Sequence, residues 1–256
     1  DMVFKRDSER ALLLLEGQLV TRYDHRARTY EGFPISRKYG RKPGIPYTTD
    51  EQKADPKFEI EPRYWMLAAT AESRIKEKMG DRALIAFRDV GAPWTNQRSA
   101  KAALIPRWPA THTVPILGVP VGLVMEFLGL FNSTIFDFLV RGHMPSGHVA
   151  LTWMLSQTAA PEPGLDARIA ENARHLSVTS HSVASEYGLA VAGWSPDERL
   201  RLDVETDALV ARAYGLDITA YEIILDSFEV LARKETAQFG CYRFKDLCLQ
   251  AFKELP

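Results

Sequence analysis

The pattern of apolar and polar positions predicts several strands in the first half of the chain. Residues 11–23 are apolar and then alternate, which is typical of strands, with Gly17 as the turn or bulge between them. Residues 83–90 and 99–107 predict two further strands, joined by the polar loop 91–98. This part of the chain should therefore contain at least one sheet.

Two segments between and after these strands have helical patterns. Ala68–Met79 is amphipathic and precedes Gly80, a residue that commonly ends helices. Residues 121–140 are almost wholly apolar, which predicts a helix at the centre of the core. The overlapping stretch 114–131 has a single charge, Glu126, but its prolines and glycines favour a buried core over a membrane span, which needs about 20 apolar residues.

Beyond the turn-forming residues 161–164 (PEPG), every pattern is helical. We expect helices over residues 166–187, 196–214, 219–231 and 242–255. Ser195 is suited to cap the second of these helices, and Gly215 to end it. The sequence thus predicts an α+β fold, with a mixed α/β domain over residues 1–160 and an all-helical C-terminal extension over residues 161–256.

Composition indicates a folded protein with separated charges. The 256 residues include 46% hydrophobic and 25% charged residues, with a net charge of −1. Residues 1–150 hold 22 Lys and Arg against 17 Asp and Glu, and the remainder holds 10 against 16. With two cysteines and a charged stretch over residues 1–10 in place of an apolar signal core, we expect a cytoplasmic protein.

Known catalytic and metal-binding patterns do not occur in the sequence. It has no His-Glu-x-x-His motif, no Gly-x-Ser-x-Gly nucleophile turn and no phosphate-binding Walker loop. His143 and His148 lie five residues apart across a loop, without a third ligand at ordinary spacing. We therefore predict no catalytic residue, no cofactor-binding residue and no metal ligand.

Basic residues, by contrast, form clusters. Arg22, His25, Arg26 and Arg28 fall within seven residues and are interleaved with tyrosines. The Pro- and Gly-rich stretch 30–62 adds Arg37, Lys38, Arg41 and Lys42, and the loop 91–98 adds Thr95, Asn96, Gln97 and Arg98. Such side chains neutralise phosphates and read base edges, which indicates nucleic-acid binding. A solvated basic face explains the same clusters equally well, and His25 is as consistent with packing as with a phosphate contact.

Short motifs occur in order along the chain. They are LEGQLV at 15–20 with YDHR at 23–26, DP at 55–56 with PRYW at 62–65, FRDV at 87–90 with TNQRS at 95–99, LGLFNS at 128–133 with FDF at 136–138, GH at 147–148, and YGL at 214–216 with RKE at 233–235. Together they resemble the target-recognition and C-terminal region of bacterial adenine-N6 DNA methyltransferases. That family includes type IIG restriction–modification enzymes and the methyltransferases of the BREX and DISARM phage-defence systems. The resemblance extends from about residue 12 to residue 255.

The resemblance implies a function without a catalytic centre in this chain. The family's Asn-Pro-Pro-Tyr motif and its S-adenosylmethionine loop are not among the 256 residues. We expect a fragment or a separate specificity chain that recognises double-stranded DNA beside a methyltransferase domain, in cis or in trans, which would hold S-adenosylmethionine. The expected DNA-binding residues are Arg22, His25, Arg26, Arg37, Lys38, Arg41, Lys42, Arg88, Thr95, Asn96, Arg98 and His148.

Two alternatives remain open from the sequence. The chain could be a protein-interaction module that docks the methyltransferase or a defence-complex partner without reading DNA. It could also be an enzyme whose site follows no known motif. A steep dependence of DNA affinity on salt separates DNA recognition from the protein-interaction alternative, because phosphate contacts release counterions.

Overall fold

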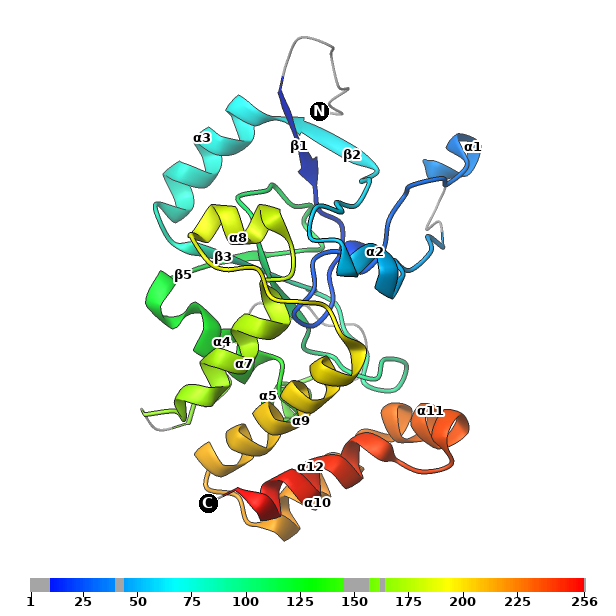
Figure 1. Ribbon diagram of the computed structural model, residues 1–256, viewed down its shortest axis with the longest axis vertical. Coiled ribbons are helices and arrows are strands. Elements are labelled where there is room, and N and C mark those ends of the chain that lie inside the picture. Colours follow the sequence, from blue (N-terminus) through cyan, green and yellow to red (C-terminus); the bar gives the residue numbers. More distant parts are fainter. Residues whose placement is uncertain (1–9, 40–43, 145–156, 162–163, 256) are drawn as a thin grey trace. The chain divides into compact units, whose positions relative to one another are not determined.

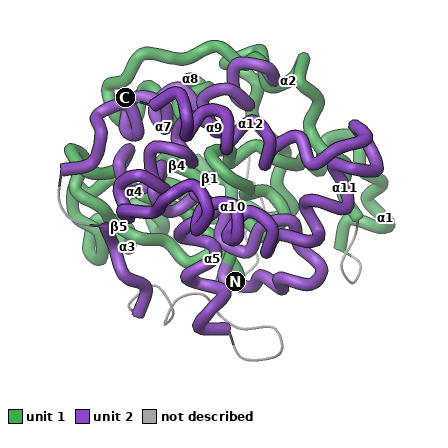
Figure 2. The backbone as a smooth tube through the Cα atoms, turned by 90° about the horizontal axis from the view of Figure 1, so that it is seen from below, with its two compact units in different colours: residues 1–88, 102–124, 177–195 green, residues 89–101, 125–176, 196–256 purple. Residues whose placement is uncertain are grey.

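The computed structural model describes residues 10–39, 44–144, 157–161 and 164–255 (Figure 1). It contains two small antiparallel sheets and a larger number of helices, so the predicted α+β class is confirmed. The chain forms two compact units (Figure 2). Unit 1 comprises residues 1–88, 102–124 and 177–195, and unit 2 comprises residues 89–101, 125–176 and 196–256.

Unit 1 contains both sheets. Strands β1 (Ala11–Leu14) and β2 (Tyr64–Leu67) pair with each other, and β3 (Ala83–Phe87) lies between β4 (Ala102–Ile105) and β5 (Ile116–Val119). Every residue of β3 and β4 is buried, which matches their continuous apolar sequences. Both strands were predicted, whereas β5 was not, because its sequence belongs to the apolar stretch that we interpreted as core.

Short helices complete unit 1. They are η1 (Gly17–Leu19), α1 (Ile35–Lys38), α2 (Asp50–Ala54), α3 (Ala68–Met79), η2 (Val121–Leu123) and α8 (His181–Tyr187). Helix α3 has the predicted bounds. It ends at Gly80, whose φ of 57° lies in a region that favours glycine.

Unit 2 is helical among its described residues. Its helices are α4 (Val124–Phe131), whose first residue belongs to unit 1, α5 (Thr134–Gly142), α7 (Ala167–Ser177), α9 (Pro196–Ala213), α10 (Ile218–Asp226), α11 (Glu229–Phe239) and α12 (Arg243–Glu254). Helices α9, α10 and α12 lie close to the helices predicted over residues 196–214, 219–231 and 242–255, whereas α11 was not predicted as a separate helix. In α4, Gly129 allows close packing, since a Cβ atom there would lie 2.5 Å from Cγ2 of Ile169.

The apolar helix predicted over residues 121–140 is broken. The Ser133 hydroxyl accepts a hydrogen bond from the Phe136 amide and so caps a new helix, and the two halves meet at 73°. Within the described residues no single helix is long and apolar enough to cross a membrane. The two halves of this bent pair taken together would be long and apolar enough, judged by length and composition only. The buried Leu128 and Phe131 instead belong to the core of unit 2.

The helix predicted over residues 166–187 is also broken, and the break separates the units. Ser180 caps α8, so the chain leaves unit 2 after α7 and returns to unit 1. As a result the two units do not follow the predicted boundary at residue 161. Unit 1 includes residues 177–195 from the predicted helical extension, and unit 2 includes residues 89–101 from the predicted α/β domain.

Candidate nucleic-acid interface

Arg26, a predicted DNA contact, is fully buried in unit 1. Its Nη1 donates to the carbonyl oxygens of Asp55 at 3.2 Å and Phe58 at 2.9 Å, and its Nη2 donates to those of Lys53 and Thr179, each at 3.0 Å. The guanidinium therefore joins three segments distant in sequence. Both terminal nitrogens already have backbone acceptors, so the assignment of Arg26 to phosphate binding is wrong for this structure.

His25 is buried as well, with 1% of its surface exposed. Its ring packs edge-on against Trp108, with 5.5 Å between ring centroids, and its Nε2 lies 3.4 Å from the Ser180 hydroxyl. Burial, more than any neighbouring charge, lowers the pKa of His25 to about 4. A neutral, enclosed imidazole cannot contact a phosphate, so the packing alternative for His25 is the one that the structure supports.

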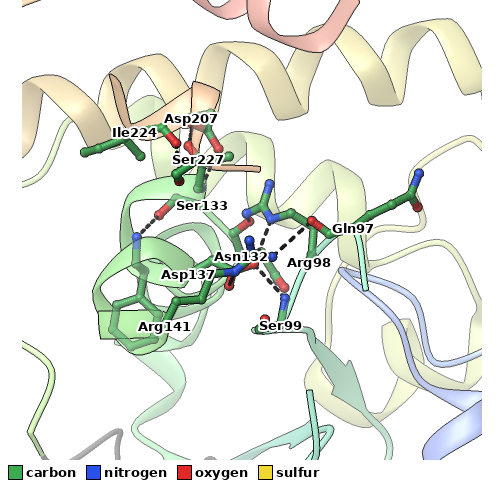
Figure 3. Close-up of polar contacts among 12 residues, drawn as sticks. Gln97, Arg98, Ser99, Asn132, Ser133, Asp137, Arg141, Asp207, Ile224 and Ser227 are labelled. Carbon is green, nitrogen blue, oxygen red and sulfur yellow. Dashed lines mark hydrogen bonds and ion pairs between the residues drawn. The ribbon is translucent and has the colours of Figure 1, made fainter. Parts of the chain in front are cut away.

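Arg98, another predicted DNA-binding residue, is 4% exposed and lies in a buried polar network of unit 2 (Figure 3). Its Nε donates to Asp137 at 3.0 Å, and its Nη2 donates to the Asn132 carbonyl oxygen at 2.6 Å. Arg141 donates to the other Asp137 oxygen at 3.0 Å. Arg98 thus holds the 91–101 loop against α5 and does not present its guanidinium to a DNA groove.

The remaining predicted residues differ in their exposure and in their partners. Thr95 is exposed. The side-chain amide nitrogen of Asn96 donates to the Ala92 carbonyl oxygen at 3.1 Å, so the group that would pair with adenine is already hydrogen-bonded. In α1, Arg37 is exposed, whereas Lys38 pairs with Glu61 at 2.7 Å. Arg22 is half-buried, with its guanidinium 5.7 Å from the centre of the Tyr23 ring. Arg41, Lys42 and His148 lie outside the described residues.

One member of the first basic cluster, Arg28, contacts a tyrosine in unit 1. Arg28 and Tyr47 are paired across an antiparallel bridge, and the Arg28 guanidinium lies 3.8 Å from the centre of the Tyr47 ring. Arg88 directly follows β3 and is half-buried. It lies near enough to Arg28 and Tyr47 for both to affect its pKa. We call these three residues the Arg28–Tyr47–Arg88 site.

The charge of this site is not balanced locally. Arg28 donates to the Ile45 carbonyl oxygen, and within the described part of the chain no carboxylate forms an ion pair with Arg28 or Arg88. Burial lowers the pKa of Arg88, and the charge of Arg28 lowers it further. Guanidinium groups without a carboxylate partner favour an anion, and phosphate oxygens match their donor geometry.

Arg88 was a predicted site residue, and Arg28 belonged to the first basic cluster. Tyr47 was missed, because it lies in the stretch 30–62 without a motif and meets Arg28 only through backbone pairing. The hydrogen bonds from the Thr48 amide to the Ala27 carbonyl and from the Thr29 amide to the Pro46 carbonyl create that pairing. Of the predicted DNA-binding residues, Arg88 belongs to this site, and Arg37 is exposed elsewhere in unit 1.

Among the residues that the structure describes, no group of three or more His, Cys, Asp or Glu side chains is arranged to hold a metal ion. The Arg28–Tyr47–Arg88 site itself offers guanidinium groups for an anion and an aromatic ring for contact. No protein-family model, no curated protein and no solved structure matches this chain.

Proposed function

We propose that the chain is a recognition module for double-stranded DNA, acting beside the catalytic domain of a restriction–modification or phage-defence adenine-N6 DNA methyltransferase. The observation that carries the proposal is the Arg28 guanidinium, which lies 3.8 Å from the centre of the exposed Tyr47 ring, has no ion pair with a described carboxylate, and is near enough to Arg88 to affect its pKa. An enzyme that modifies a base in a duplex must hold the flanking backbone, and such arginines supply phosphate contacts that set register. The motif order described above supports the methyltransferase context.

In this proposal the exposed Arg37 adds a second phosphate contact, and the buried Arg26 and Arg98 maintain the fold. S-adenosylmethionine would be bound by the methyltransferase domain, and DNA binding would bring the protein to the nucleoid. Sequence choice would then depend on side chains other than Arg98.

The test is the salt dependence of duplex binding, measured by fluorescence anisotropy. Wild type should lose affinity linearly in log–log form as salt rises, and Arg88→Gln should lower the slope by roughly one unit, because one phosphate contact is lost. Arg74→Gln is a matched control, since Arg74 is an exposed arginine on α3 of the same unit. No binding to any duplex at low salt would contradict the proposal and favour the protein-interaction alternative.

A further inference from the structure

The Tyr47 ring is exposed on a backbone that is held in place. Ile45 and Thr48, on either side, are 2% and 7% exposed. The Thr48 amide donates to the Ala27 carbonyl oxygen at 3.3 Å, and the Thr48 hydroxyl donates to the Arg26 carbonyl oxygen. Arg26 is itself fixed by its hydrogen bonds to distant segments of unit 1. Tyr47 therefore projects from an ordered support.

The ring nevertheless leaves most of its surface in water. Tyr47 is 71% exposed, and the Arg28 guanidinium covers one ring face at 3.8 Å from its centre. A guanidinium on one face orders the ring without burying the other face. An aromatic ring in this setting offers a flat apolar surface directly beside the Arg28 cation, with Arg88 near enough to affect the same charge balance.

We propose that the Arg28–Tyr47–Arg88 site binds an unpaired nucleotide of DNA, with the phosphate at the two guanidinium groups and the base stacked on Tyr47. This inference rests on the proposed DNA-binding function and specifies the form of DNA that the site prefers. The phosphate contacts alone would serve an intact duplex. In a duplex, however, each base face is covered by its neighbours, so only an unpaired base offers a face to the ring.

Stacking of one base on an aromatic side chain is commonly worth a factor of roughly ten or more in affinity. Stacking needs only the flat face that every base has. The expected preference is therefore for an unpaired base of any identity. Tyr47→Phe keeps the ring, whereas Tyr47→Leu removes it. Because the side chain is 71% exposed, neither change should unfold unit 1.

The experiment compares a short DNA duplex with the same duplex containing one extra, unpaired adenine, by fluorescence anisotropy at low salt. Wild type and Tyr47→Phe should bind the bulged duplex about tenfold more tightly than the intact one. Tyr47→Leu should bring the ratio of the two affinities close to one. Tyr39→Leu is the control, because Tyr39 is another exposed tyrosine of unit 1, and this variant should keep the wild-type ratio. Thermal melting of each variant verifies folding.

Each outcome decides between the two proposals. Equal wild-type affinity for both duplexes, or a preference that survives in Tyr47→Leu or is lost in Tyr39→Leu, overturns the stacking inference and leaves the DNA-binding function standing. Binding to the bulged duplex alone supports the inference and contradicts recognition of intact duplex. Failure of both duplexes to bind overturns both.

Discussion

Replacing Asp137 by Asn should strongly destabilise unit 2. The Asp137 carboxylate is fully buried and accepts hydrogen bonds from Nε of Arg98 at 3.0 Å, from Nε of Arg141 at 3.0 Å and from the Ser99 amide at 2.9 Å. Asparagine keeps the shape but removes the charge that balances two arginines, whose side chains are 4% and 10% exposed. Its amide group would also direct hydrogens toward groups that are themselves donors.

Loss of one partner from a buried ion pair costs about 3–5 kcal/mol, because the other charge remains in a medium that solvates it poorly. In a chain of this size each kcal/mol lowers the melting temperature by roughly 2–4 °C. Asp137→Asn should therefore lower the melting temperature by roughly 6–20 °C, measured by circular dichroism. Asp246→Asn, an exposed change in the first turn of α12, should cost less than about 1 kcal/mol. Equal losses in both variants would refute the role given to Asp137.

Three further outcomes follow from the buried residues. Gly129→Ala should lower the melting temperature, because the added methyl group would overpack against Ile169 and reduce the free energy of unfolding by about 1–3 kcal/mol. Arg26→Ala should destabilise unit 1 in the same assay while leaving the salt slope of duplex binding unchanged, because its guanidinium binds carbonyl oxygens. The folded-state pKa of His25, about 4, lies below its ordinary 6.5, so the unfolded chain binds the proton first. Stability should fall by roughly 3 kcal/mol as pH drops from 6.5 toward 4 in urea titrations, and His25→Gln should flatten that dependence.

Sequence patterns predicted the local elements well where a single signal dominated. The amphipathic spacing of Ala68–Met79 and the following Gly80 located α3, and Pro196 located the start of α9. They failed where a side chain had two possible roles. Ser133 lies in an apolar run that reads as one helix, and only its hydrogen bond to the Phe136 amide begins a second helix there. The neighbouring Thr134 amide then donates to Asp207, which lies 73 residues later in the chain and so beyond any local pattern.

The basic clusters show why the candidate site was harder to predict than the fold. Arg26 and Arg28 are two residues apart and would share a face in a regular strand, yet Arg26 is enclosed by backbone carbonyls and Arg28 lies against Tyr47. The chain bends at residues 25 and 27, so strand periodicity does not apply. A guanidinium has five donors that suit either carbonyl oxygens or phosphate, and the sequence records only the donor. Which acceptor it meets depends on distant segments such as residues 53–58 and 179, so charge clusters identify candidate DNA contacts but do not separate them from arginines that hold the fold together.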